Sequence, residues 1–201
     1  PRDWSSDVCS SDLVEQAGLG MPDRDYYLEQ DAKRTALRKQ YAEFVSNIFT
    51  LLGEKPKAAE EASKGVLRIE TLLAKASMSK VDRRDPKKIY HYTQLTELQK
   101  AAPGLLWDVY FKKVSAEPVL ALNVAQPDFM KALSDLTKGP FNSTEWRNYL
   151  KWNVVRRVAG ALPQKFVDED FKWKSALSGI AKLPPRWKRC GGSLAMPLSA
   201  L

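Results

Sequence analysis

The sequence has very few of the side chains from which catalytic and metal sites are usually built. Its 201 residues include one histidine, His91, and two cysteines, Cys9 and Cys190. A structural zinc site takes four Cys or His ligands, and an HExxH zinc-peptidase site needs two histidines on one helix face. A Ser-His-Asp triad would depend on His91, and disulfide-stapled secreted scaffolds carry more cysteine. These counts exclude several classes of catalytic and metal site from the 201 residues.

Long apolar runs and phosphate-binding loops are absent as well. No window holds eighteen consecutive apolar residues, so we expect no membrane-spanning segment in these residues. There is no GxxxxGK[ST] motif, and the Gly-Leu-Gly at residues 18–20 is too short for a dinucleotide fingerprint. We interpret His91 as a packed structural histidine and Asp168, Glu169 and Asp170 as charges at a helix N-terminus. We therefore assign no catalytic, cofactor-binding or metal-binding residue to this chain.

The chain is basic, with 32 Lys and Arg against 24 Asp and Glu, a formal net charge of +8. Acidic residues are interleaved with the basic ones almost everywhere, which favours a solvated basic surface over a phosphate-binding face. Trp146, Tyr149 and Trp152 lie among cationic residues, a combination that can stack nucleic-acid bases. Helix packing explains the same pattern, so we expect no nucleic-acid partner. A basic helical module that binds nucleic acid or a protein partner remains the alternative.

The two ends differ from the middle in composition. Residues 3–13, DWSSDVCSSDL, resemble the translation of a common sequencing adapter, so we expect residues 1–13 to be an artefact and disordered. Residues 191–201, GGSLAMPLSAL, carry no charge and form a tail that we cannot place, either truncated or frameshifted. The sequence between them, residues 14–190, is the part from which we predict a fold.

That middle part predicts an all-α, irregular multi-helix domain. Apolar residues recur every three or four positions over residues 31–52, and Gly53 suits a left-handed helix cap. Pro56 can begin the next helix, which carries its own apolar stripe to Ala76. Asp85-Pro86 should interrupt the helical pattern, because the residue before proline avoids helical angles.

Shorter elements follow. We predict helices over residues 93–100 with Thr93 as the cap, 106–114, 127–138, and 142–162 with a capping box of Asn142 and Glu145. Residues 118–124 alternate weakly and favour a short strand. A last helix begins near Asp168, carries Phe171, Leu177 and Ile180, and ends at Pro184-Pro185.

Five segments, in this order, carry a resemblance to one protein family. They are GLGMPDRDYYL at residues 18–28, IETLLAKAS at 69–77, RRDPKKIYHYTQLTEL at 83–98, YLKW at 149–152, and PPRWKRC at 184–190. Together they resemble the N-terminal region of the neprilysin-like zinc metalloendopeptidases, a family that includes neprilysin, endothelin-converting enzymes and bacterial oligopeptidase O. The resemblance covers about residues 14–190.

The resemblance implies a longer parent enzyme with two helical lobes around a cavity that admits small peptides. In the family, zinc is held by the histidines of HExxH and a distal glutamate in the C-terminal part. This chain contains no HExxH, so the resemblance implies part of the cavity-capping, substrate-size-limiting lobe, inactive alone, with the C-terminal catalytic domain as its partner. A non-catalytic scaffold derived from that lobe is a further possibility. The parent's compartment is undetermined, and the resemblance implies an extracytoplasmic one (periplasmic, secreted or membrane-anchored).

Overall fold

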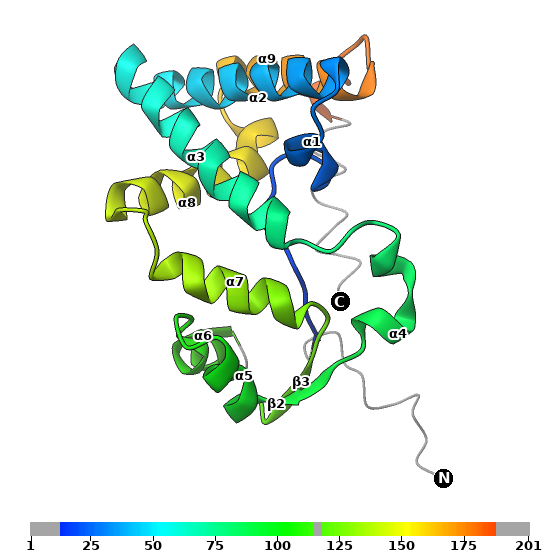
Figure 1. The fold of residues 1–201 in the computed structure, drawn as a ribbon. Coiled ribbons are helices and arrows are strands. Elements are labelled where there is room, and N and C mark those ends of the chain that lie inside the picture. Colours follow the sequence, from blue (N-terminus) through cyan, green and yellow to red (C-terminus); the bar gives the residue numbers. More distant parts are fainter. Residues whose placement is uncertain (1–12, 115–117, 188–201) are drawn as a thin grey trace. The chain divides into compact units, whose positions relative to one another are not determined.

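The computed structural model describes residues 13–114 and 118–187, and the chain divides into two compact units (Figure 1). The first unit comprises Pro1–Leu28 and Glu70–Ser143, and the second comprises Glu29–Ile69 and Thr144–Leu201. Neither unit is continuous in sequence, and two boundaries between them fall inside helices, one between Ile69 and Glu70 and one between Ser143 and Thr144.

All the regular secondary structure in the described residues of the second unit is helical. It contains α2 (Ala32–Leu51), the first part of α3 (Pro56–Ala76), most of α8 (Ser143–Val158), the 3₁₀ turn η3 (Ala159–Ala161) and α9 (Gln164–Ser178). The Asp31 side chain caps α2 by accepting a hydrogen bond from the Arg34 N–H at 3.0 Å. Gly53 takes a φ of 94° after the helix, and Pro56 begins α3. The predicted helix, cap and restart are all confirmed.

Aromatic side chains form the core of the second unit. Helices α2 and α9 lie side by side (Figure 1), and Tyr41 and Phe44 on α2 pack against Trp173 on α9. Trp152 on α8 completes the cluster, with ring centroids 5.9 Å from Tyr41 and 5.2 Å from Phe44. The Trp152 indole N–H donates to the Tyr41 hydroxyl at 2.9 Å. The polar atoms of both rings therefore have a partner inside the core.

The prediction for the last helix was wrong in both its ends and its buried face. Helix α9 begins at Gln164 and ends at Ser178, where Gly179 caps it with a φ of 73°. Ile180 lies beyond the helix and is exposed, and Trp173 is the large side chain that α9 buries. The glycine, rather than the double proline, ends the helix because it adopts the left-handed conformation at low cost.

The first unit combines short helices with a small sheet. Its described residues form α1 (Asp25–Leu28), the end of α3, the 3₁₀ turn η2 (Asp82–Arg84), α4 (Pro86–Ile89), α5 (Leu95–Ala101), α6 (Trp107–Val114) and α7 (Pro127–Thr137). The strands are β1 (Leu13–Val14), β2 (Tyr92–Gln94) and β3 (Ala121–Val124), in the order β1-β3-β2. Strand β1 is parallel to β3, and β2 is antiparallel to β3.

The sheet tests three predictions. The strand expected within residues 118–124 is confirmed as β3, whereas β1 and β2 went unpredicted because two or three residues are too few to show alternation. Thr93 does not cap a helix, since it lies in β2 and Gln94 occupies the cap position of α5. Leu13, assigned to the artefact segment and expected to be disordered, pairs with Asn123 in the sheet. Residues 1–12 lie outside the described residues.

Helices dominate the described part of the chain, which confirms the all-α fold class with only a small added sheet. Within residues 13–114 and 118–187, no helix is both long enough and apolar enough to cross a bilayer.

Gly104 sets a close contact between the loop after α5 and helix α7. Its N–H donates to the Ser134 Oγ at 2.8 Å, and its carbonyl accepts from the Thr137 Oγ1 at 3.3 Å. A Cβ at this position would overlap the Ser134 carbonyl oxygen and Thr137 Oγ1. We therefore expect Gly104→Ala to lower the free energy of unfolding by about 1–3 kcal/mol, as overpacking does.

Chemical denaturation would measure this change, with Gly160→Ala as the control variant. Nothing lies within 4 Å of a Cβ built at Gly160, so that variant should unfold within about 0.5 kcal/mol of the parent chain or be slightly stabilised. Equal stabilities for the two variants would contradict the expected contact.

Candidate functional site

The described residues do not bring potential metal ligands together. No group of three or more His, Cys, Asp or Glu in residues 13–114 and 118–187 could hold a metal ion. Cys9 and Cys190 lie outside this range. The described residues do form a clamped loop and a pocket in the first unit, and a second pocket in the second unit, lined by Asn47, Thr50, Leu51, Lys165, Asp168, Glu169 and Lys172.

The loop formed by residues 18–27 folds around a buried hydroxyl group. The Tyr27 hydroxyl oxygen accepts hydrogen bonds from the N–H groups of Gly20 at 3.0 Å and Met21 at 2.9 Å. The same hydroxyl donates to the Glu70 Oε2 at 2.8 Å. Glu70 is fully buried and Tyr27 nearly so. One side chain therefore fixes the turn of the loop and gives the Glu70 carboxylate a hydrogen-bond donor.

The burial of this pair changes the acidity of the hydroxyl. Burial is the main cause that raises the pKa of Tyr27 well above its ordinary value of 10.0, and the charge of the Glu70 carboxylate adds to the shift. The two backbone N–H groups oppose the shift to a smaller extent. Tyr27 therefore stays a hydrogen-bond donor through the neutral range.

Charged groups hold the rest of the loop, mainly through partners that lie outside it. The Arg24 guanidinium donates to the Ser77 carbonyl oxygen, and Asp23 forms an ion pair with Lys80. Asp23 also accepts from the Asp25 N–H at 2.8 Å. The loop is thus attached to the end of α3 and the segment after it.

Glu70 is a residue that our sequence analysis missed. It follows Ile69 and lies between Val66 and Leu73, at positions where the sequence shows the apolar stripe of α3. A carboxylate on an apolar helical stripe is the signal that could have identified it, because such a group needs a buried partner.

The RRDP motif, residues 83–86, joins the 3₁₀ turn η2 to helix α4 in the segment that follows α3. Asp85 caps α4 by accepting from the Lys87 N–H at 3.0 Å, and Pro86 occupies the first turn. Asp82 accepts from the Ser79 hydroxyl at 2.6 Å and pairs with Lys88 at 2.5 Å. The hydrogen bond from Lys88 is the main cause that lowers the pKa of Asp82, with a further contribution from Ser79. The expected interruption at Asp85-Pro86 is confirmed, and the motif acts there as a structural turn.

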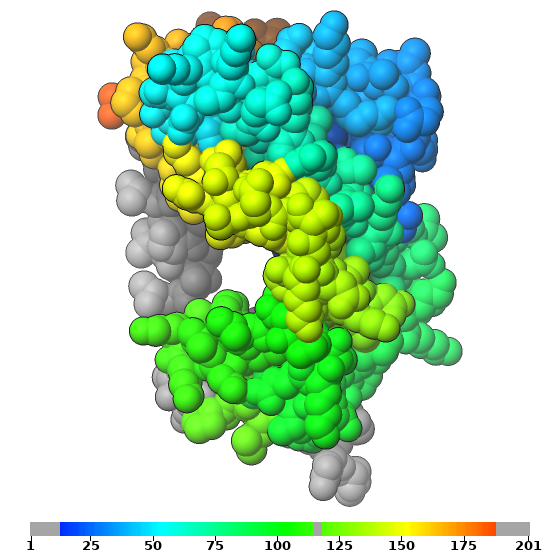
Figure 2. All heavy atoms as spheres, turned by 60° about the vertical axis from the view of Figure 1, so that its left-hand side comes forward, coloured from blue at the N-terminus to red at the C-terminus, as the bar shows by residue number. Residues whose placement is uncertain are grey.

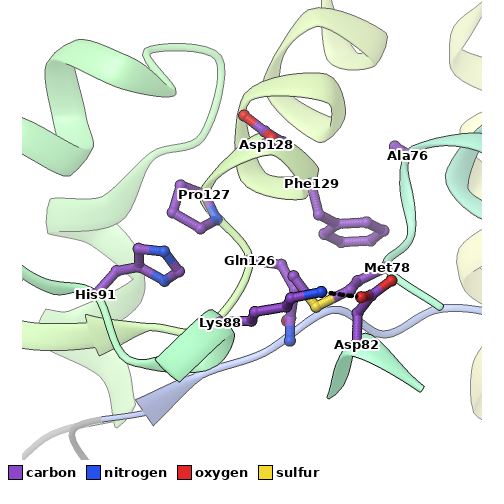
Figure 3. Close-up of a pocket in the computed structure, with 9 residues that line it drawn as sticks. All are labelled: Ala76, Met78, Asp82, Lys88, His91, Gln126, Pro127, Asp128 and Phe129. Atoms are coloured by element: carbon purple, nitrogen blue, oxygen red, sulfur yellow. Dashed lines mark hydrogen bonds and ion pairs between the residues drawn. The ribbon is translucent and has the colours of Figure 1, made fainter. Parts of the chain in front are cut away.

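A pocket of about 510 Å³ lies beside this turn (Figure 3). The α3 end, η2, α4 and the start of α7 contribute to its walls. His91, which we interpreted as structural, lines the pocket from the segment before β2, and its Nδ1 atom is buried. The residues around the pocket are Ala76, Met78, Asp82, Lys88, His91, Gln126, Pro127, Asp128 and Phe129.

Helix α8 carries the YLKW motif and the aromatic residues that raised the question of base stacking. Tyr149 and Trp152 are buried, so Trp152 packs in the core, as the helix-packing interpretation predicts. Lys151 pairs with Glu54 at 3.2 Å and lies 5.5 Å from the centre of the Phe49 ring. Part of α8 lies at the surface of the molecule in the space-filling view (Figure 2, yellow). Leu150 on this helix is exposed to solvent.

The acidic trio does not lie at a helix N-terminus, so that interpretation was wrong. Helix α9 begins four residues earlier than we predicted, at Gln164, which places the trio in its second turn. Asp170 is largely buried and pairs with Lys174 at 2.6 Å. Glu169 pairs with Lys172 and accepts from the Asn47 amide at 3.1 Å. The carboxylates at 169 and 170 therefore take part in side-chain contacts of the second unit.

The last motif, PPRWKRC, is described only as far as Trp187, which is 71% exposed. Its remaining residues, Lys188, Arg189 and Cys190, lie outside the described part of the chain.

Comparison with known proteins gives consistent results over almost the whole sequence. The profile described as peptidase family M13, which represents its N-terminal domain, matches residues 10–198. Endothelin-converting enzyme 1 of Cavia porcellus is 32% identical over 189 residues, covering 88% of this chain and 24% of that enzyme. Neprilysin-3 of Drosophila melanogaster is 30% identical over 189 residues, which cover 88% of this chain and 24% of that protein.

Solved structures agree with the sequence matches. The zinc metalloprotease Zmp1 of Mycobacterium tuberculosis, in its open state, aligns with a TM-score of 0.82 and 28% identity. The alignment covers 88% of this chain and 28% of that one. The chain thus spans about a quarter of the length of the relatives it matches.

Proposed function

Because this chain belongs to peptidase family M13, we propose that it forms part of the helical, cavity-capping lobe of a zinc metalloendopeptidase that cleaves small peptides. The match of the family profile to residues 10–198 is the observation that carries this proposal. The fold gives further support, since helices dominate both units and the aligned relative is a zinc metalloprotease.

In this proposal the chain contributes structure and not chemistry. The 201 residues include one histidine and no HExxH motif, so they cannot supply the two histidine ligands of such a zinc site. Its clamped loop and aromatic core would instead give the lobe a fixed shape, which limits the size of the peptides that enter. Zinc, the catalytic residues and the peptide-binding groups around them would come from the parent's C-terminal domain, the proposed partner of this lobe.

We expect the purified 201-residue chain to cleave no peptide. The test is incubation with a quenched fluorescent peptide of about ten residues, with and without added Zn²⁺. Circular dichroism and the tryptophan fluorescence of the buried cluster would show that the chain is folded during the assay. Cleavage that appears with Zn²⁺ and disappears with a chelator would overturn the proposal that this chain is inactive.

A further inference from the structure

Helix α8 carries apolar side chains on two of its sides, and only one of these sides is covered. Tyr149 and Trp152 are buried, and Trp152 belongs to the aromatic core. Leu150, Val154 and Val158 recur every four residues, so they share another side of the helix. These three residues are 59%, 64% and 44% exposed. Apolar residues on both sides are typical of a helix that is covered on both sides in the intact protein.

Two arginines border the exposed side. Arg147 precedes Leu150 by three residues and Arg157 follows Val154 by three, which keeps both guanidinium groups on the same side of α8. Both arginines are exposed, and neither has an ion-pair partner in the part of the chain that the structure describes. The single acidic residue of α8, Glu145, pairs instead with an arginine of α3. We call the exposed side, Arg147, Leu150, Val154, Arg157 and Val158, the α8 strip.

The charges of the α8 strip narrow the kind of partner that could cover it. A second copy of this chain is a poor fit, because two facing strips would bring only cations together and like charges at an interface repel. A membrane surface is also a poor fit. Helices that lie on membranes usually present Trp, Phe or Leu over a wide face, whereas this strip has one leucine and two valines. A protein segment with apolar side chains between carboxylates would match both the apolar residues and the arginines.

We propose that the α8 strip docks a segment of the parent polypeptide from outside these 201 residues, and that this segment presents an apolar ridge between two carboxylates. Arg147 and Arg157 are ten residues apart, about 15 Å along a helix, so the two carboxylates would have a similar separation. The chain covers 24% of endothelin-converting enzyme 1 and 28% of the aligned Zmp1 chain, so most of each relative lies outside the matched region. The choice of the parent as the source rests on the proposed function, whereas the chemistry of the segment rests on the strip.

Two synthetic helical peptides of identical composition test this chemistry. Both carry three leucines on one face. The first peptide places two glutamates ten residues apart at the ends of that face, and the second places both on the opposite face. We expect the 201-residue chain to bind the first at least about fivefold more tightly in a calorimetric titration, because only its carboxylates reach both arginines. Added salt should reduce this difference, since the ion pairs lie at the rim of the contact.

A charge placed within the strip should prevent docking. Val154→Asp should weaken the binding of the first peptide about tenfold or more, because a carboxylate would be buried against the leucines. Val81→Asp is the matched control, since Val81 is 77% exposed and lies in the first unit, and it should bind as the parent chain does.

Reversal of the two bordering charges should reverse the preference. With Arg147→Glu and Arg157→Glu combined, a peptide with lysines in place of the two glutamates should bind more tightly than the original. Lys112→Glu combined with Lys113→Glu makes the same change of net charge on exposed residues of α6 and should keep the preference of the parent chain. A reversal in both double variants would mean that net charge alone decides binding, which would refute the docking geometry.

A photo-crosslinking residue at position 154 of the full-length parent tests the source of the segment. We expect mass spectrometry to locate the crosslink outside the 201 residues, beside Asp or Glu, and a crosslinker at Val81 should not reach the same segment. A crosslink to a second copy, to lipid or within the 201 residues would contradict the proposed occupant.

Equal binding of the two peptides, or binding of neither, would overturn the proposal. So would unchanged binding by Val154→Asp, if the variant keeps the thermal stability of the parent chain. None of these results bears on family membership or on the peptidase assay. If no longer parent were found, the proposed function would fail instead, so the two failures are distinct.

Discussion

Trp152→Ala is expected to lower the free energy of unfolding by about 3–5 kcal/mol, the range observed when a large buried aromatic residue is truncated. Trp152 is 1% exposed and contacts Tyr41 and Phe44 through ring edges. The substitution leaves a cavity between α2, α8 and α9 and removes the indole N–H that donates to the Tyr41 hydroxyl. Most domains are stabilised by only about 5–15 kcal/mol, so much of the chain's stability would be lost.

Urea denaturation followed by circular dichroism would measure the effect. Leu150→Ala is the matched control, because Leu150 is two residues away on the same helix and is 59% exposed. We expect that variant to differ from the parent by less than about 1 kcal/mol. If Trp152→Ala were as stable as Leu150→Ala, the aromatic cluster would not be the core of the second unit.

Tyr27→Phe should lower the free energy of unfolding by about 2–4 kcal/mol, although it removes a single oxygen atom. The loss leaves the buried Glu70 carboxylate without the hydroxyl that donates to it, and it leaves two backbone N–H groups without their acceptor. A buried group that loses its partner costs more than the hydrogen bond itself, and a charged group costs most. Tyr92→Phe is the control, because Tyr92 is 65% exposed and should tolerate the same change.

The parent chain and Tyr27→Phe can also be compared in alkaline solution. Because the pKa of Tyr27 is raised in the folded state, the unfolded chain releases this proton first, at its ordinary pKa of 10.0. The stabilisation from the protonated hydroxyl is complete below pH 10 and is lost as the pH rises toward the folded-state pKa. The stability difference between the parent chain and Tyr27→Phe should therefore shrink above pH 10. A constant difference from pH 8 to pH 11 would contradict the buried Tyr27–Glu70 bond.

Local sequence signals predicted most of the helices well. Helix α2 has a capping aspartate, a regular apolar stripe and a glycine with a φ of 94°, and both ends were predicted to within one residue. Each of these signals acts within one or two turns of the chain, so it is visible without knowledge of the tertiary structure. The family resemblance was also visible, because the five motifs are contiguous segments.

Features that depend on distant residues were not predictable in the same way. The partner of Tyr27 is Glu70, 43 residues away, and the donor that orients Gln126 is Gln16, 110 residues away. Strand β1 has two residues and exists only through its pairing with β3. The start of α9 was misplaced because the acidic trio resembles a helix start, whereas Gln164 gives no capping signal. Sequence patterns report local preference, and these features are set by packing.

The discontinuous construction of the two units has a consequence for the newly made polypeptide as it leaves the ribosome. Residues 70–143 of the first unit are synthesised between the two segments of the second. The sheet and the clamped loop can therefore assemble once α7 has emerged. Tyr41 on α2, by contrast, cannot form its core contacts until Trp152, 111 residues later, and then Trp173 have been synthesised. Contacts so distant in sequence slow folding, and the apolar faces they will cover stay open to chaperones and proteases until then. We expect the first unit to acquire protection earlier in translation, and the second to be the later and more vulnerable of the two.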